Sequence, residues 1–309
     1  MNQVECTREL ADMLSGAQLP ALPQSAIRLL ELSQDAENGP LEFAVPIESD
    51  PGLTGQVLKF VNSSYFGFSR EISSVKLAIN LVGIRTIKNF ALWSAVFSLM
   101  PNPRCGPFDL KNLWQDSLRR GLFAREMGKL LGAEDFEDLF AAALLQDMAI
   151  PLLVKELPEQ YCWLLDNRDG GNQRLSNLEQ EAFGWTHAEA AGVIARGWKL
   201  PDEFASLIEA HADIENMLKN GCGSVGERAV ALSALLPGST DTEWVEGPIF
   251  SWALEEMAGS GLDLFEILQQ VDEDYEEFAP ALKLTTPSKS LVDYLDELEE
   301  DEDDEDEDE

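Results

Sequence analysis

The stretch LFAAALLQDMAI, residues Leu139–Ile150, decides the fold. Among its twelve residues, only the neighbours Gln146 and Asp147 carry polar side chains. A helix that is apolar on every face is expected in the middle of a domain. Burying an amide and a carboxylate together is unfavourable unless both find partners. The pair therefore marks a place where chemistry is present or has been lost, and it bears on whether the protein is an enzyme.

The spacing of apolar residues is helical almost throughout, and no run of alternating β-branched residues between hairpin turns stands out. Asp50-Pro51 has the form of a helix start, with an Asp N-cap and Pro at the first helical position. Further starts are marked by capping-box patterns: Ser176-x-x-Glu179, Thr186-x-x-Glu189, Ser224-x-x-Glu227 and Thr240-x-x-Glu243. We expect an all-α fold of roughly a dozen helices.

The chain is strongly acidic, with 22 basic and 57 acidic residues and a net charge of −35. Residues 286–309 hold 1 basic and 14 acidic residues, so a charge of −22 is spread over the rest. Such a surface repels nucleic acid and anionic membranes and favours basic partners. The run of acids Glu299–Glu309 cannot form a core, and we expect residues 286–309 to be a disordered tail.

The cysteines and the N-terminal residues indicate in which cellular compartment the protein is expected. Four cysteines lie far apart without CxxC spacing: Cys6, Cys105, Cys162 and Cys222. This pattern argues against a zinc cluster and against a disulfide scaffold. The N-terminus has neither a basic start nor an apolar signal core. The apolar run Phe90–Met100 is about half of the roughly 20 residues that a membrane span needs. We expect a cytoplasmic protein.

Several motifs follow one another in an order that is specific as a set. They are LPALP (19–23), NSSYFGF (62–68), ISSVKLAINLVGIRTIKNFAL (72–92), LWQDS (113–117), ALLQDMAI (143–150), GWTHAEAAGVIARGWKLP (184–201) and IEAH (208–211). This order resembles the HDOD (HD-related output domain) family over about residues 17–215. The resemblance implies an all-α fold related to the metal-dependent HD phosphohydrolases, generally without their complete catalytic set. Members of this family usually serve in bacterial signalling, as output or scaffold modules.

Set against the HD pattern, this chain has lost metal ligands. The resemblance places Asp116 at the first His position and Gln146 at the His of the His-Asp pair, while Asp147 is retained. Imidazoles and carboxylates fix a divalent ion that acidifies a water, whereas Gln is neutral and a poor ligand. His187 and His211, the two histidines of the chain, fall where this family and its longer HD relatives place histidines. We therefore expect a vestigial HD site with no catalytic residue, no metal and no cofactor.

Two interpretations of this cluster remain open. Asp116, Asp147, His187 and His211 could still gather one weakly held ion. Alternatively, Asp147 is a buried acid that pairs with a His or with Arg119 or Arg120 and holds helices in register, and we favour this interpretation. Removing one partner of such a buried pair typically costs about 3–5 kcal/mol.

Other candidate residues have structural explanations. Ser224 lies in GCGSVG (221–226), which lacks the spacing of a phosphate loop, and we expect a helix N-cap rather than a nucleophile. We expect three tryptophans to pack in the core: Trp114, Trp185 and Trp198. Five basic residues could form a landing site for the acidic tail, although we favour solvated charges: Lys59, Arg70, Lys76, Arg85 and Lys88.

These observations predict four segments: an N-terminal helix (1–16), an HDOD domain (17–215), a helical extension packed on the core (216–285) and the acidic tail (286–309). The favoured function is a non-enzymatic signal-transduction output or scaffold module that binds protein partners of a signalling pathway, among which the acidic surface favours basic ones. One alternative is a weak metal-dependent phosphohydrolase that acts on a nucleotide or a phosphorylated signal. A second is that the acidic tail captures a basic partner. The sequence does not indicate an oligomeric state.

Overall fold

The computed structural model describes residues 10, 13–14, 19–35, 37–259 and 261–307, with side chains described up to residue 300. The described residues form helices and no strand, which confirms the all-α class. The N-terminal helix expected over residues 1–16 lies largely outside the described residues. The helices are α2 (Gln24–Leu32), α3 (Pro40–Glu48), α4 (Pro51–Val61), α5 (Val75–Val82), α6 (Ile84–Leu99), α7 (Leu110–Leu130), α8 (Phe136–Leu145), α9 (Ile150–Glu156), α10 (Pro158–Asp166), α11 (Leu175–Phe183), α12 (His187–Gly197), α13 (Asp202–Glu209), α14 (Ile214–Asn220), α15 (Val225–Ser233), α16 (Gly247–Ala258), α17 (Leu264–Phe278) and α18 (Leu291–Glu307), with short 3₁₀ turns η1 (Ser64–Phe66), η2 (Asp169–Gly171), η3 (Ala210–Ala212) and η4 (Ala279–Leu282).

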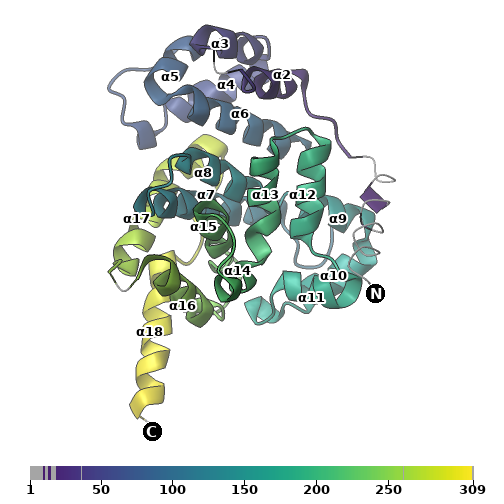
Figure 1. The fold of residues 1–309 in the computed structure, drawn as a ribbon, viewed down its shortest axis with the longest axis vertical. Helices are drawn as coiled ribbons and strands as arrows, with labels where there is room; N and C mark the ends of the chain where they lie inside the picture. The colour runs from purple at the N-terminus through teal and green to yellow at the C-terminus, as the bar shows by residue number, and fades with distance from the viewer. Residues whose placement is uncertain (1–9, 11–12, 15–18, 36, 260, 308–309) are drawn as a thin grey trace.

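The helices form three parts along the long axis of the molecule (Figure 1). Helices α2–α6 lie together at one end, which we call the N-lobe. Helices α7, α8, α12, α13 and α15 form the middle. Helices α16 and α18 lie at the other end, from which α18 projects, whereas α17 packs against α7 and η1. The site described below lies in the middle part, where α7 and the turn after α8 face α12 and η3.

Local sequence accounts for several helix starts. The Asp50 carboxylate accepts a hydrogen bond from the Leu53 N–H at 3.0 Å, and Pro51 opens α4, as predicted. The capping boxes of Thr186 and Ser224 are also present, at α12 and α15. Each satisfies amide groups that a helix start leaves without intrahelical partners. Ser224 is thereby confirmed as an N-cap.

Helices α7 and α8 pack closely against each other in the middle of the molecule. Two glycines of α7 allow this approach. A Cβ added at Gly121 would lie 3.0 Å from Leu144 Cγ and 3.1 Å from the Phe140 carbonyl oxygen. One added at Gly128 would lie 2.7 Å from Leu139 Cδ1. These positions leave no room for a side chain, so the two glycines set the distance between the helices.

Leu139–Ile150 is buried at every residue, which confirms its expected place in the core. It is not one helix, however. Helix α8 ends at Leu145, residues 146–149 form a turn, and α9 begins at Ile150. Pro151 explains the interruption, because a proline in a continuing helix would lose its N–H bond and clash with the carbonyl four residues earlier. The turn places the backbone of Gln146 and Asp147 outside regular helix.

Two of the predicted capping boxes are absent. Ser176 lies within α11, and Glu179 is fully buried instead of capping the helix start. Thr240 and Glu243 lie in the irregular segment that precedes α16. The pattern S/T-x-x-E is local, whereas Glu179 is held by partners on other helices.

The C-terminal part of the chain packs against α7. Arg125 of α7 donates from Nη2 to Asp274 Oδ2 of α17 at 2.9 Å in a buried contact. The disordered tail expected over residues 286–309 is not found over its described part, because Leu291–Glu307 is helix α18. Leu291, Tyr294 and Leu295 are 0%, 2% and 4% exposed, and this apolar stripe anchors the helix.

The start of α18 is also fixed by a tertiary contact. The Asp272 carboxylate of α17 accepts from the N–H groups of Leu291 at 2.8 Å and Val292 at 3.2 Å. An acidic side chain at a helix N-terminus satisfies free amides and interacts favourably with the helix dipole. This partner lies nearly 20 residues earlier in the chain, which explains why the acidic composition of the segment alone gave the opposite expectation.

A disulfide between Cys105 and Cys162 joins the loop of residues 101–109 to α10. The two cysteines are 57 residues apart in sequence, and their spacing gave no indication of the pairing. Cys222 is exposed and forms no disulfide with another described cysteine. Within the described part of the chain, we find no helix long and apolar enough to cross a membrane.

The tryptophans and the basic residues behave largely as expected. Trp114 and Trp185 are buried, and Trp198 donates from Nε1 to the Pro20 carbonyl at 3.0 Å, so all three are packing residues. Arg85 and Lys88 face the carboxylate of Asp138 on α8. Among the side chains that the structure describes, no ion pair joins the five basic residues to residues 286–300.

Candidate functional site

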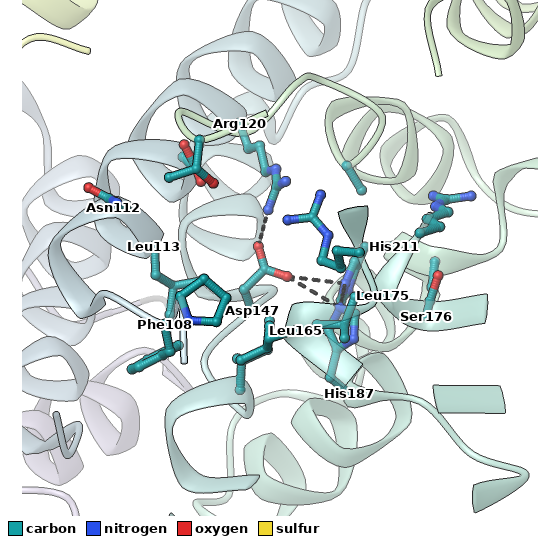
Figure 2. Close-up of a pocket in the computed structure, with 18 of the residues that line it drawn as sticks. Phe108, Asn112, Leu113, Arg120, Asp147, Leu165, Leu175, Ser176, His187 and His211 are labelled. Carbon is teal, nitrogen blue, oxygen red and sulfur yellow. Dashed lines mark hydrogen bonds and ion pairs between the residues drawn. The ribbon is translucent and has the colours of Figure 1, made fainter. Parts of the chain in front are cut away.

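The candidate site is built by four elements that meet in the middle of the molecule. Asp116 and Arg120 lie one turn apart on α7 and therefore share a face. Asp147 lies in the turn between α8 and α9. His187 is the first residue of α12, after its N-cap Thr186, and His211 lies in η3. Figure 2 shows Asp147 with Arg120 on one side and the two histidines on the other.

Asp147 and Arg120 form an ion pair within the core. The guanidinium of Arg120 donates to Asp147 Oδ2, and the side chains are 16% and 4% exposed for Arg120 and Asp147, respectively. The sequence left Arg119 and Arg120 open as partners. Arg119 instead donates to the backbone carbonyl of Lys289. The charge of Asp147 is therefore compensated within the chain.

Asp147 Oδ1 faces both histidines. It lies 3.3 Å from His187 Nε2 and 3.6 Å from His211 Nε2, and the two Nε2 atoms are 3.0 Å apart. Oxygen and nitrogen donors bind zinc at about 2.0–2.2 Å, so one ion could lie within bonding distance of all three atoms. The three donors thus fit a single divalent ion.

The other nitrogen of each histidine has a partner that orients its ring. His187 Nδ1 lies 2.6 Å from Glu179 Oε2, which also accepts from the His187 backbone N–H at 2.7 Å. The hydroxyl of Tyr161 donates to Glu179 Oε1 at 2.8 Å. His211 Nδ1 donates to the Ile208 carbonyl at 2.6 Å. Such partners select the tautomer that presents Nε2 to the site.

Burial and charge set opposite protonation states for the two histidines. Burial alone would lower the pKa of His187, but the carboxylates of Glu179 and Asp147 raise it to about 9. Burial lowers the pKa of His211 to about 3, although Asp147 opposes the shift. Burial would raise the pKa of Asp147, but Arg120 and the histidines hold it well below its usual range. Without an ion, His187 carries a proton that it shares with neutral His211 and with Asp147, and a metal would have to displace it.

Asp116 and Gln146, which the resemblance places at histidine positions of the HD pattern, are not part of the three-donor cluster. Asp116 Oδ1 accepts from the Ser239 backbone N–H at 2.7 Å, and burial raises the pKa of this carboxyl although Arg120 opposes the shift. The Gln146 side chain is fully buried, and its oxygen lies 3.5 Å from the Ser233 hydroxyl of α15. Gln146 does not line the cavity beside Asp147, and its Nε2 has no hydrogen-bond partner among the residues that the structure describes.

The cavity beside Asp147 is lined by both signs of charge. Its arginines are Arg120, Arg168 and Arg174, and its carboxylates include Asp116, Asp147 and Glu246. Each arginine already has a carboxylate partner. Arg168 Nη2 lies 3.0 Å from Asp241, and Arg174 Nε lies 2.9 Å from Glu246. A phosphate group entering here would have to compete with these pairs.

The comparisons with known proteins agree with this architecture. The HDOD domain family model matches residues 19–214, nearly two thirds of the chain. The chain belongs to the HDOD family. Its fold is similar to that of an HDOD domain protein of unknown function from Geobacter sulfurreducens, with a TM-score of 0.69 and 21% identity over 91% of this chain and 98% of the other. A proposed signal transduction protein from Marinobacter aquaeolei VT8 gives a TM-score of 0.67 and 20% identity, over 91% of this chain and 64% of the other.

A relative in sequence is an uncharacterized protein of Treponema pallidum (strain Nichols), 24% identical over 197 residues. The match covers 62% of this HDOD chain but 38% of that relative. The chain therefore spans well under half of the relative's length. At these identities the solved structures show the fold alone.

Sequence reasoning found part of the candidate site and missed the rest. It placed Asp147, His187 and His211 together, and the structure brings them together. It assigned Glu179 to a capping box and did not consider Tyr161. The signal available was Gly184, which ends α11 in a left-handed conformation and turns the chain so that Glu179 faces the start of α12.

Proposed function

We propose that this HDOD protein is a non-enzymatic signalling module that acts by binding other proteins, and that its HD-like site is structural. The observation that carries the proposal is the state of the His-Asp position. Gln146 stands where the HD pattern has a metal-binding His and is buried against Ser233 instead of lining the cavity. The negative charge of Asp147 is meanwhile balanced by the guanidinium of Arg120. The pair that would anchor a catalytic ion serves to join helices.

Charge supports a basic protein partner. At a net charge of −35, the chain repels nucleic acid and anionic membranes and attracts cationic surfaces at low ionic strength. We also propose a cytoplasmic location, because the apolar run Phe90–Met100 is about half of the roughly 20 residues that a membrane span needs. Capture of a basic partner by the full-length protein should weaken as salt rises. Repeating the capture after deletion of residues 299–309 separates the acidic run from the domain: binding that persists excludes the tail as the binding element.

A second candidate is a metal-dependent phosphohydrolase, which the convergence of Asp147, His187 and His211 favours. These residues would hold the ion, and the ion would acidify a bound water. Three ligands are few for an HD site. Asp116 and Gln146, which stand at histidine positions of the HD pattern, both lie outside the cluster.

One experiment separates the two functions. The metal content of the purified full-length protein is measured, and hydrolysis is assayed on a panel of nucleotides and cyclic dinucleotides with Mg²⁺, Mn²⁺, Fe²⁺ or Zn²⁺. The matched variants are Asp147→Asn and Asp202→Asn, since the Asp202 side chain is 93% exposed. We expect substoichiometric metal and equal background rates in all three proteins. A stoichiometric ion with turnover that disappears only in Asp147→Asn would establish the enzyme instead.

A further inference from the structure

Two neighbouring helices of the N-lobe expose large aliphatic side chains. Leu41 and Val45 of α3 are 56% and 66% exposed, and Leu77 and Leu81 of α5 are 44% and 48% exposed. Each pair is spaced by four residues, so its members lie on one side of their helix. Helices α3 and α5 pack against each other at the tip of the N-lobe (Figure 1). We call this surface the α3–α5 face.

The fold does not account for these exposed side chains. The core contacts of the two helices are made by other residues, such as Phe43 and Ile47 of α3 and Ile79 of α5, all nearly fully buried. Single exposed aliphatic residues are common, but neighbouring ones on adjacent helices are typical of an interaction site. The face therefore indicates a partner.

Charge identifies which partner fits. Residues 19–100, which contain the N-lobe, hold 7 acidic and 6 basic residues, a net charge of −1. The remainder of the chain carries −34. Two copies would repel each other over most of their surfaces. The N-lobe is the part of the molecule where a second copy can approach with little repulsion.

The shape of the molecule supports the same arrangement. The α3–α5 face lies at one end, and α18, which leads into the acidic run, projects from the opposite end (Figure 1). A pair joined through the N-lobes keeps the two most acidic ends far apart. The exposed Glu48 of α3 and Lys76 of α5 place opposite charges on the two helices of the face. A two-fold axis can therefore set α3 of one copy against α5 of the other with unlike charges facing.

We propose that the α3–α5 face is a two-fold interface through which two copies of this chain associate. Four aliphatic side chains form a small contact compared with the roughly 800 Å² per partner of a standard interface. The dimer should therefore be reversible, with a dissociation constant of about 1–100 µM. Added salt should strengthen the association because it screens the acidic bodies. This proposal is independent of whether the HD-like site is catalytic.

Sedimentation velocity of the full-length protein between about 1 and 500 µM tests the proposal across the expected range, at low and at physiological salt. The variants Val45→Glu and Leu81→Glu each place a carboxylate in the interface. Leu130→Glu is the matched control, because Leu130 is 52% exposed at the end of α7. All three sites are on the surface, and unchanged far-UV circular dichroism and Tm will show that the variants fold.

The expected result is a concentration-dependent dimer of the parent protein that is stronger at higher salt. Association should weaken at least ~10-fold (about 1.4 kcal/mol) in Val45→Glu and in Leu81→Glu but not in Leu130→Glu. If the parent protein stays monomeric at every concentration and salt level, the proposal is overturned. That holds even if a different protein is found to bind the α3–α5 face. A dimer that survives both substitutions, or one that Leu130→Glu weakens equally, overturns it too.

Discussion

Removing the positive charge beside Asp147 tests whether the HD-like site is a structural ion pair. In Arg120→Met, the Asp147 carboxylate stays buried, with its side chain 4% exposed, and loses the partner on Oδ2. Breaking a buried pair from one side typically costs about 3–5 kcal/mol. Protonated His187 remains 3.3 Å from Oδ1, so we expect the lower end, about 3 kcal/mol in the free energy of unfolding.

The reverse change, Asp147→Asn, leaves Arg120 and His187 without the carboxylate that they share. We expect it to lower the free energy of unfolding by about 3–5 kcal/mol. Because each single change breaks the same pair, the double variant should lose less than the sum. We expect a coupling energy of about 2–3 kcal/mol.

Urea unfolding at pH 7, followed by far-UV circular dichroism, gives these values for the parent and the three variants. The control is Arg28→Met. Arg28 pairs with Glu31 three residues later, and both side chains are more than half exposed. Its cost should be at most about 0.5 kcal/mol. Additive single effects, or an Arg120→Met cost below about 1 kcal/mol, would refute the structural role of the pair.

Three further predictions concern the surroundings of the site. Gly121→Ala should destabilise the fold by about 1–3 kcal/mol, because the new Cβ meets the Phe140 backbone on α8; urea unfolding measures the loss. The raised pKa of His187 contributes stability that is complete below about pH 6.5 and is lost as pH rises through about 9, up to about 3 kcal/mol. Glu179→Gln should flatten this pH dependence, and a slope equal to the parent's contradicts the assignment. Reducing the Cys105–Cys162 disulfide should lower the free energy of unfolding by roughly 2–4 kcal/mol, since the bond closes a loop spanning 57 residues. The stability of the Cys105→Ser variant should not change when reductant is added.

Some features of the fold could be predicted from sequence because their causes are local. The twelve buried residues of the central stretch follow from composition, and the starts of α4, α12 and α15 follow from capping side chains within three residues. The gathering of Asp147 with the two histidines came from the order of motifs. In each case the decisive residues are close in sequence or fixed by the family pattern.

Other features depend on contacts between distant segments and were missed for that reason. Glu179 matches a capping box locally, yet its partners Tyr161 and His187 lie on other helices. The start of α18 depends on Asp272 of α17. The Cys105–Cys162 pairing likewise requires knowing that the loop of residues 101–109 crosses α10. Amino-acid composition and residue spacing do not predict such contacts between distant segments.

The turn that follows α8 bears on whether a histidine at position 146 could act as a metal ligand. Gln146 is fully buried beside Ser233, so a Gln146→His substitution would put an imidazole into a closed part of the core and not into the cavity. For an imidazole at position 146 to reach the cavity, the turn of residues 146–149 would have to rotate. A metal ligand at position 146 would therefore require a change of backbone conformation as well as a change of residue.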